Sequence, residues 1–214
     1  MSIDDIKNIA VIGAGNMGHQ IAMLCAIHGY KTVCTDINAK ILKKAENFAD
    51  TYLAGRVEKE RLTQEQARAA RDRISFTPSM EESVNDADYV IEAVLEVLDL
   101  KRKIFADLDK MAPPHAILAT NSSAIISSKI ADATKRPEKV LNVHFFNPAL
   151  VMKLVEVVQG PHVSDETRKI TMALCEKLDK VPVHLKKEVH GFLLNRIFDA
   201  ITREALWLLE MGVA

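Results

Sequence analysis

The sequence predicts an α/β protein built on a doubly wound, mostly parallel β-sheet, and three observations predict this class. Short apolar, β-branched runs, typical of strands buried on both faces, alternate with longer segments of helical periodicity. A glycine-rich turn joins the first of these runs to the first helical segment. The 214 residues, 48% of them hydrophobic, can form one large core. Strands alternating with helices form right-handed crossovers, which place helices on both faces of a sheet.

The first 120 residues contain the alternation. The strand-like runs are 8–12, 31–35, 74–76, 89–93 and 116–120, and the helical segments are 17–28, 38–48, 63–71 and 98–111. Gly29 supplies a left-handed residue that ends many helices, and Asn38 can cap the next one. Thr63 and Gln66 form a capping box, and Pro113 ends the fourth helical segment.

After residue 140 the alternation stops. The runs 140–146 and 152–158 are separated by only five residues, too few for a crossover helix, so we expect an antiparallel hairpin added to the sheet edge. A helix over 165–178, a strand near 181–185 and a long helix over 192–211 complete the chain. A single terminal helix is not a domain by itself.

Composition excludes several kinds of protein. The 28 basic and 29 acidic residues give a net charge of −1, so we expect neither a nucleic-acid partner nor a membrane surface. Cys25, Cys34 and Cys175 lie in apolar segments, which suits reduced thiols, and no spacing predicts a metal site. The N-terminus resembles neither a signal peptide nor a membrane span, so we expect a cytoplasmic protein with a small-molecule partner.

The turn at residues 13–18, GAGNMG, has the context of a dinucleotide-binding motif. Gly13 permits the tight turn, Gly15 lets the backbone approach a pyrophosphate, and Gly18 lets the helix pack on the strand. Asp36, at the end of the second strand, can accept hydrogen bonds from ribose hydroxyls and repel a 2′-phosphate, which favours NAD over NADP. The alternative is a tight turn beside a solvated aspartate.

Polar side chains also follow two later strands, at the edge of the sheet where ligands of such folds gather. Ala93 ends the fourth strand, and Glu96 and Lys101 lie just beyond it. Asn121 and Ser123 follow the fifth strand. The first group can equally be a solvated helix start, and the second can cap a helix.

The predicted hairpin places a histidine opposite a carboxylate. If the hairpin is centred on Leu150, His144 faces Glu156. A carboxylate fixes the imidazole tautomer and stabilises the imidazolium, which a general base for a hydroxyl proton requires. Such a pair suits hydride transfer to nicotinamide, because the alcohol must lose a proton as well. The alternative is a structural cross-strand pair.

Five motifs resemble the 3-hydroxyacyl-CoA dehydrogenases, including the bacterial 3-hydroxybutyryl-CoA dehydrogenases. They are GAGNMG at 13–18, ATNSS at 119–123, HFFNP at 144–148, MKLVEV at 152–157 and GFLLNR at 191–196. The resemblance implies an NAD-dependent enzyme that oxidises an L-3-hydroxyacyl-CoA or catalyses the reverse reduction. It implies that His144 is the base, that Glu156 is its partner, and that Ser123 and Asn195 bind the reacting oxygens of the substrate. The positions implied at the NAD site are Asn16, Met17, Ala93, Glu96, Lys101, Asn121, Ser123 and Asn147.

The resemblance also implies two parts: a Rossmann-type NAD-binding domain over residues 1–186, and over 187–214 the first helix of an all-helical domain that serves substrate binding and homodimerisation. That helix should expose an apolar face in a single chain. His190 and Ala200 stand where the family usually has proline, so this tail resembles the gulonate dehydrogenase and lambda-crystallin branch. A dehydrogenase of a free 3-hydroxy acid and a catalytically silent NAD-binding protein are the alternatives. Arg56 and Lys59 are the candidate cations for CoA.

Overall fold

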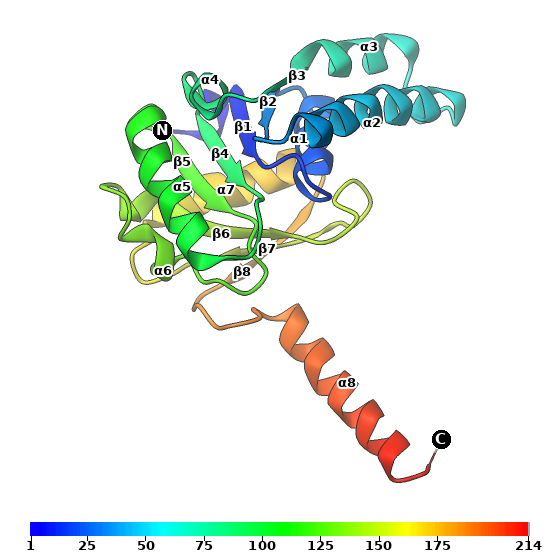
Figure 1. The fold of residues 1–214 in the computed structure, drawn as a ribbon, viewed down its shortest axis with the longest axis vertical. Helices are drawn as coiled ribbons and strands as arrows, with labels where there is room; N and C mark the ends of the chain where they lie inside the picture. Colours follow the sequence, from blue (N-terminus) through cyan, green and yellow to red (C-terminus); the bar gives the residue numbers. More distant parts are fainter. Residues whose placement is uncertain (214) are drawn as a thin grey trace.

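A computed structural model describes residues 1–213, and eight strands of that span form one sheet (Figure 1). The strands are β1 Asn8–Ile12, β2 Lys31–Thr35, β3 Ile74–Thr77, β4 Tyr89–Glu92, β5 Ile117–Thr120, β6 Val140–Phe145, β7 Leu154–Val158 and β8 Val181–Leu185. Their order is β3-β2-β1-β4-β5-β6-β7-β8, and β1 to β6 are parallel. The direction of winding reverses between β1 and β4, which confirms the doubly wound α/β class and places a ligand crevice there.

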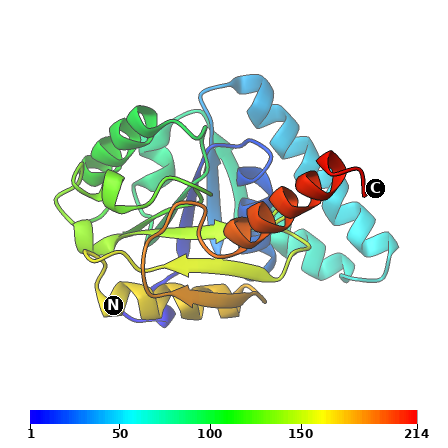
Figure 2. The same cartoon turned by 90° about the horizontal axis from the view of Figure 1, so that it is seen from below.

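Helices cover both faces of this sheet (Figure 2). They are α1 Gly18–Ile27, α2 Ala39–Glu58, α3 Gln64–Arg73, α4 Met80–Val84, α5 Leu98–Met111, α6 Ser128–Ala131, α7 Asp165–Lys177 and α8 Leu194–Glu210, with 3-10 turns at Ile3–Asp5 and Pro137–Lys139. One core cluster packs α1, α2, α3 and α7 against the sheet, and another packs α4, α5 and α6 against the opposite face.

Several local predictions can be compared with these bounds. The helix over 98–111 and the capping box of Thr63 and Gln66 are confirmed. The helix that Asn38 caps is longer than predicted, because α2 continues through Gly55 to Glu58. Neither α4 nor α6 was predicted, since five and four residues are too few to show a helical period.

The antiparallel hairpin of β6 and β7 has the predicted register, with His144 opposite Glu156. Its predicted place at the sheet edge needs correction. The edge strand is β8, which pairs parallel with β7 and places Val183 beside Glu156. The reason is that α7 carries the chain back along the sheet, so that β8 starts level with β7 and extends the sheet by one strand.

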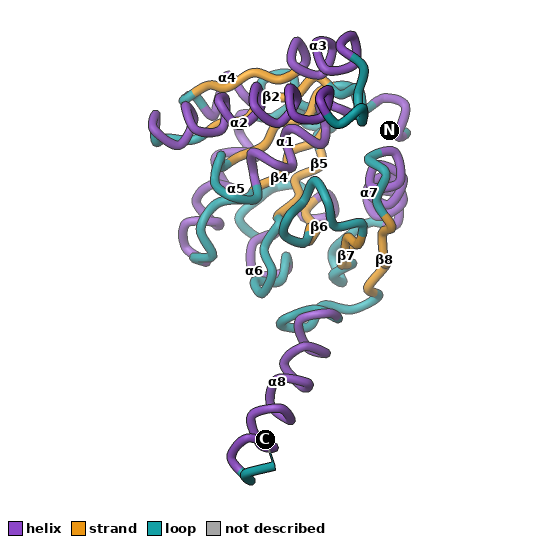
Figure 3. Tube along the Cα trace, turned by 90° about the vertical axis from the view of Figure 1, so that its right-hand side faces the viewer, coloured by secondary structure: helices purple, strands orange, loops and turns teal. Residues whose placement is uncertain are grey.

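The helix α8 projects away from the body of the molecule (Figures 1 and 3). None of its residues is buried, and Trp207 remains 64% exposed. The apolar side chains Ile197, Phe198 and Ile201 are also exposed, as expected for this helix in a single chain. Over residues 1–213, no helix is long and apolar enough to cross a membrane.

Candidate active site

Two glycines of the turn after β1 are required by the packing of the protein itself. Gly13 has φ +99°, and a Cβ there would lie 2.7 Å from the carbonyl oxygen of Ala93. A Cβ on Gly18 would overlap the carbonyl oxygen of Gly13. The N–H of Gly13 donates to the carbonyl of Thr35 at 2.8 Å, which joins the turn to β2. Glycine at these two positions therefore allows the N-terminus of α1 to pack closely against the ends of β1 and β4.

Gly15 is different, because the described part of the chain places no heavy atom within 4 Å of a Cβ built there. Its backbone is half-buried and lies just before the N-terminus of α1. Free N–H groups at a helix N-terminus bind phosphate, and a Cβ would occupy the space where a phosphate approaches. Gly15 therefore fits a bound dinucleotide rather than a packing requirement.

Asp36 lies at the end of β2, where its carboxylate connects two turns. Oδ2 accepts the N–H of Ala14 at 3.0 Å, and Oδ1 accepts the N–H of Asn38 at 2.9 Å. The side chain is half-buried beside the glycine turn, and it is not the isolated, solvated carboxylate of the alternative interpretation. These two bonds hold the carboxylate beside the position that the ribose of a dinucleotide would take if its pyrophosphate bound at Gly15.

Asn16 links the glycine turn to the loop between β6 and β7. Its side-chain amide donates to Oδ1 of Asn147 at 3.2 Å, across 131 positions of sequence. Met17, beside it, is partly buried against the core. The structure thus brings together Asn16 and Asn147, which the sequence placed in separate motifs.

Lys101 is not part of a solvated helix start, whereas the side chain of Glu96 is 39% exposed. Lys101 is 1% exposed, and its ammonium donates to both oxygens of Glu92 at 2.8 and 3.0 Å. It also lies 3.4 Å from Oε2 of Glu96. The Glu92 carboxylate is fully buried and accepts the Thr120 hydroxyl at 2.7 Å and the Val94 N–H at 2.7 Å. Sequence reasoning assigned Glu92 no role, although an acidic residue ending an apolar strand was an available signal.

Glu96 in turn holds the loop that follows β5. Its Oε1 accepts the Ser122 hydroxyl and the N–H groups of Ala124 at 3.1 Å and Ile125 at 3.2 Å. Burial alone would raise the pKa of Glu96, but the Ser122 hydroxyl, the Lys101 ammonium and the two N–H groups lower it below its ordinary value. An ionised Glu96 therefore fixes the segment that contains Ser123.

Asn121 and Ser123 have separate tasks in that segment. Oδ1 of Asn121 accepts the N–H of Phe145 at 2.9 Å, which joins the ends of β5 and β6. Ser123 is half-buried, and its carbonyl oxygen accepts the side-chain amide of Asn195 at 3.5 Å. The structure therefore brings Asn195, at the start of α8, beside Ser123.

His144 and Glu156 form a buried pair at the end of the hairpin. Nδ1 of His144 lies 2.8 Å from Oε2 of Glu156, and the two residues are 5% and 1% exposed. Because an ionised carboxylate only accepts, Nδ1 carries the proton and Nε2 is left with a free lone pair. Nε2 has no hydrogen-bond partner among residues 1–213, and the rings of Phe146 and Phe192 flank the imidazole. This is the geometry of a general base.

The other oxygen of Glu156 faces the start of α8. Oε1 accepts the N–H groups of Leu193 at 3.0 Å and Leu194 at 2.9 Å. Burial alone would raise the pKa of Glu156, but the hydrogen bonds from His144 and from these two N–H groups lower it below its ordinary value. Sequence reasoning missed these two backbone donors, because no side chain marks them.

Arg56 and Lys59 lie apart from this group, at the end of α2 that projects away from the sheet (Figure 1). The guanidinium of Arg56 lies 5.8 Å from the centre of the Tyr52 ring, and Lys59 is exposed. Over the described residues, no group of three or more histidine, cysteine or acidic side chains could hold a metal ion.

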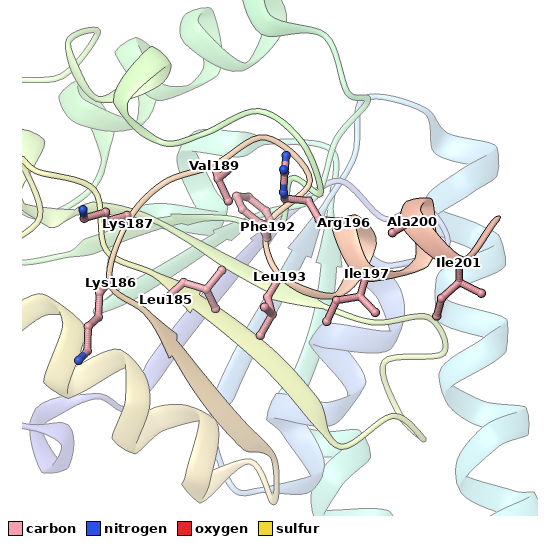
Figure 4. A pocket seen from close by; sticks show the side chains of 10 residues that line it. All are labelled: Leu185, Lys186, Lys187, Val189, Phe192, Leu193, Arg196, Ile197, Ala200 and Ile201. Carbon is pink, nitrogen blue, oxygen red and sulfur yellow. The ribbon is translucent and has the colours of Figure 1, made fainter. Parts of the chain in front are cut away.

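A hollow of about 560 Å³ lies on the outer side of the chain between β8 and α8 (Figure 4). It is lined by Leu185, Lys186, Lys187, Val189, Phe192, Leu193, Arg196, Ile197, Ala200 and Ile201. His144, Ser123 and Asn195 do not line it, so it is separate from the polar group at the carboxyl ends of the strands.

Residues 8–189 match the family model described as 3-hydroxyacyl-CoA dehydrogenase, NAD binding domain. The chain belongs to the 3-hydroxyacyl-CoA dehydrogenase family. NAD is the cofactor, and the glycine turn with Gly15 and Asp36 is its candidate site.

The similarity to known members of this family extends over nearly the whole chain. It is 39% identical to a probable 3-hydroxybutyryl-CoA dehydrogenase of Bacillus subtilis, over 98% of this chain and 72% of the relative. A crystal structure of 3-hydroxybutyryl-CoA dehydrogenase from Escherichia coli has 38% identity and a TM-score of 0.94, over 98% of this chain and 44% of that one. A diketoreductase structure has 34% identity and a TM-score of 0.91, over 98% and 74%.

Proposed function

We propose that this protein interconverts an L-3-hydroxyacyl-CoA and the 3-oxoacyl-CoA with NAD as cofactor. The observation that carries this proposal is the buried His144–Glu156 pair at 2.8 Å, which leaves Nε2 free. The pair lies at the same edge of the sheet as Ser123 and Asn195, and the hydrogen bond between these two residues joins the loop after β5 to the start of α8.

Each residue of the site has a separate role in the proposed reaction. When bound, NAD⁺ accepts the hydride of the substrate carbinol. Nε2 of His144 accepts the hydroxyl proton, and the Glu156 carboxylate stabilises the imidazolium that forms. The Ser123 hydroxyl and the Asn195 amide hold the reacting oxygen. In the reverse direction, His144 returns the proton to the carbonyl oxygen.

The finer assignments rest on relatives. We propose a short acyl chain, such as that of 3-hydroxybutyryl-CoA, in fatty acid or butyrate metabolism, because similar proteins from Bacillus subtilis and Escherichia coli carry that name. Arg56 and Lys59 are proposed contacts of the CoA phosphates. A cytoplasmic location is part of the same proposal.

The division into residues 1–186 and 187–214 is also a proposal. It is supported by α8, which projects from the body without a buried side chain. Its apolar surface supports a homodimer formed through the helical part.

The decisive experiment is His144→Ala, assayed by NADH absorbance with acetoacetyl-CoA. Removal of a general base should lower the rate at least about a hundredfold, while NADH binding, followed by fluorescence, stays unchanged because His144 lies outside the glycine turn. Full activity of the variant would remove His144 from the mechanism. Wild-type NADH binding without turnover of any hydroxyacyl substrate would favour a silent NAD-binding protein.

A second candidate is a dehydrogenase of a free 3-hydroxy acid. His190 and Ala200 favour it, since they depart from the acyl-CoA pattern near α8, and a diketoreductase is among the similar structures. Steady-state kinetics with a ladder of acyl-CoAs and the corresponding free acids separate the two. A higher kcat/KM for the free acids would select the second candidate.

A further inference from the structure

Phe192 combines a bulky aromatic side chain with a left-handed backbone. Its φ is +49°, between Gly191 at +75° and Leu193 at −90°. In this region the Cβ of an L-residue crowds a backbone carbonyl oxygen, so glycine is common there and phenylalanine is not. Such an outlier persists only where surrounding contacts hold it, and it is a reason to look for a function.

The buried ring supplies those contacts. Phe192 has no exposed surface, and its ring centre lies 5.7 Å from that of His144. Figure 4 shows the Phe192 ring within the curve of the linker, next to Val189, whereas Leu193 and Ile197 point in the opposite direction. The N–H of Phe192 also donates to the carbonyl of Val189 at 3.1 Å.

The backbone conformation has a direct effect on the site. A left-handed residue followed by a right-handed one turns successive N–H groups toward the same side, where they form a concave nest for an anion. Here the N–H groups of Leu193 and Leu194 reach the same oxygen, Oε1 of Glu156, at 3.0 and 2.9 Å. Oε2 of that carboxylate then faces Nδ1 of His144 at 2.8 Å. Of the titratable side chains described, only His144 bonds to Glu156.

We propose that Phe192 is a positioning residue for the His144–Glu156 pair. Its buried apolar side chain anchors the turn, and its left-handed backbone aims two N–H groups that hold the Glu156 carboxylate against the imidazole. The start of α8 thereby supports the catalytic pair through the main-chain N–H groups of Leu193 and Leu194, in addition to the proposed role of the Asn195 side chain. This inference rests on the proposed role of His144 as the base.

The test compares Phe192→Ile with Phe192→Leu. The two new side chains contain the same atoms, and both remove the ring, but a β-branched residue tolerates positive φ much less well. Phe192→Ile should therefore leave the left-handed region and withdraw the two N–H groups, while Phe192→Leu retains them. Thermal unfolding and NADH fluorescence check that both variants fold.

The first readout needs no substrate. In proton NMR of the full chain, the Nδ1 proton shared with Glu156 should give a low-field signal, assigned by its absence in His144→Ala. We expect Phe192→Leu to keep this signal and Phe192→Ile to lose it. The second readout is kinetic: Phe192→Ile should lower kcat/KM about tenfold relative to Phe192→Leu.

Equal low-field signals and equal kcat/KM values in the two variants would overturn the inference. If Phe192→Ile does not fold, amide exchange decides: Leu193 and Leu194 should exchange at least about tenfold faster in Glu156→Ala than in the wild type, and equal rates would overturn it. If the wild type shows the low-field signal but turns over no hydroxyacyl substrate, the proposed function fails while the NMR comparison still decides the positioning role.

Discussion

Gly15 and Gly18 belong to the same turn, and the structure predicts opposite consequences for adding one methyl group to each. A methyl at Gly18 overlaps the Gly13 carbonyl oxygen, so the start of α1 must move away from β1. Such overpacking costs about 1–3 kcal/mol, which for a chain of this size lowers Tm by roughly 2–12 °C. A methyl at Gly15 contacts no described atom, and its φ is not in the left-handed region.

Gly15→Ala should therefore leave the free energy of unfolding unchanged or raise it by about 0.4–1 kcal/mol, because alanine restricts the unfolded chain. The same methyl occupies the space through which the pyrophosphate reaches the backbone. We expect NADH affinity to fall at least about tenfold, or about 1.4 kcal/mol.

Urea unfolding and NADH fluorescence titration of Gly15→Ala and Gly18→Ala measure both quantities on each variant. The reasoning would be refuted if Gly15→Ala bound NADH like the wild type, or if it lost as much stability as Gly18→Ala. Either result would mean that Gly15 serves packing and not the cofactor.

Three further predictions concern the carboxylates. In Glu156→Gln the new amide donates to Nδ1 of His144, so the imidazole proton moves to Nε2, which can then no longer accept a proton from the substrate. We expect kcat to fall about 10²–10⁴-fold in the acetoacetyl-CoA assay. Activity above a tenth of wild type would contradict the role of Glu156. Lys101→Met leaves the buried Glu92 carboxylate without its partner and should lower the free energy of unfolding in urea by about 3–5 kcal/mol. Adding Glu92→Gln to this variant should recover a large part of the lost stability. A double variant no more stable than Lys101→Met would count against this role of the buried pair. The pKa of Glu96 is lowered in the folded protein, so its contribution to stability is present above its ordinary value of 4.5 and is lost as pH falls through the lowered value. Glu96→Gln should therefore be less stable than wild type at neutral pH, and the difference in urea unfolding should shrink progressively as the pH falls below 4.5. A difference that does not change with pH would exclude this role.

The fold class, the hairpin register and the dinucleotide-binding turn could be predicted from the amino-acid sequence alone. These features depend on local periodicity and on short-range geometry. The strand-to-helix glycine turn and the short link of residues 146–153 between β6 and β7 each restrict the path of the chain, which is why His144 could be placed opposite Glu156. Short elements such as α6 lack that periodicity and escaped prediction.

The other partners of the carboxylates could not be predicted from the sequence, because they depend on how the folded chain brings distant residues together. Lys101 points to Glu92 rather than to solvent, and Glu96 holds the loop of Ser123, because strands β4 and β5 bring these groups to one edge. The link from Glu156 to the N–H groups of Leu193 and Leu194 spans 37 and 38 positions of sequence and involves main-chain donors. Every residue except proline carries such a donor, so only the path of the chain, with Phe192 in its left-handed turn, determines which two of them reach the carboxylate.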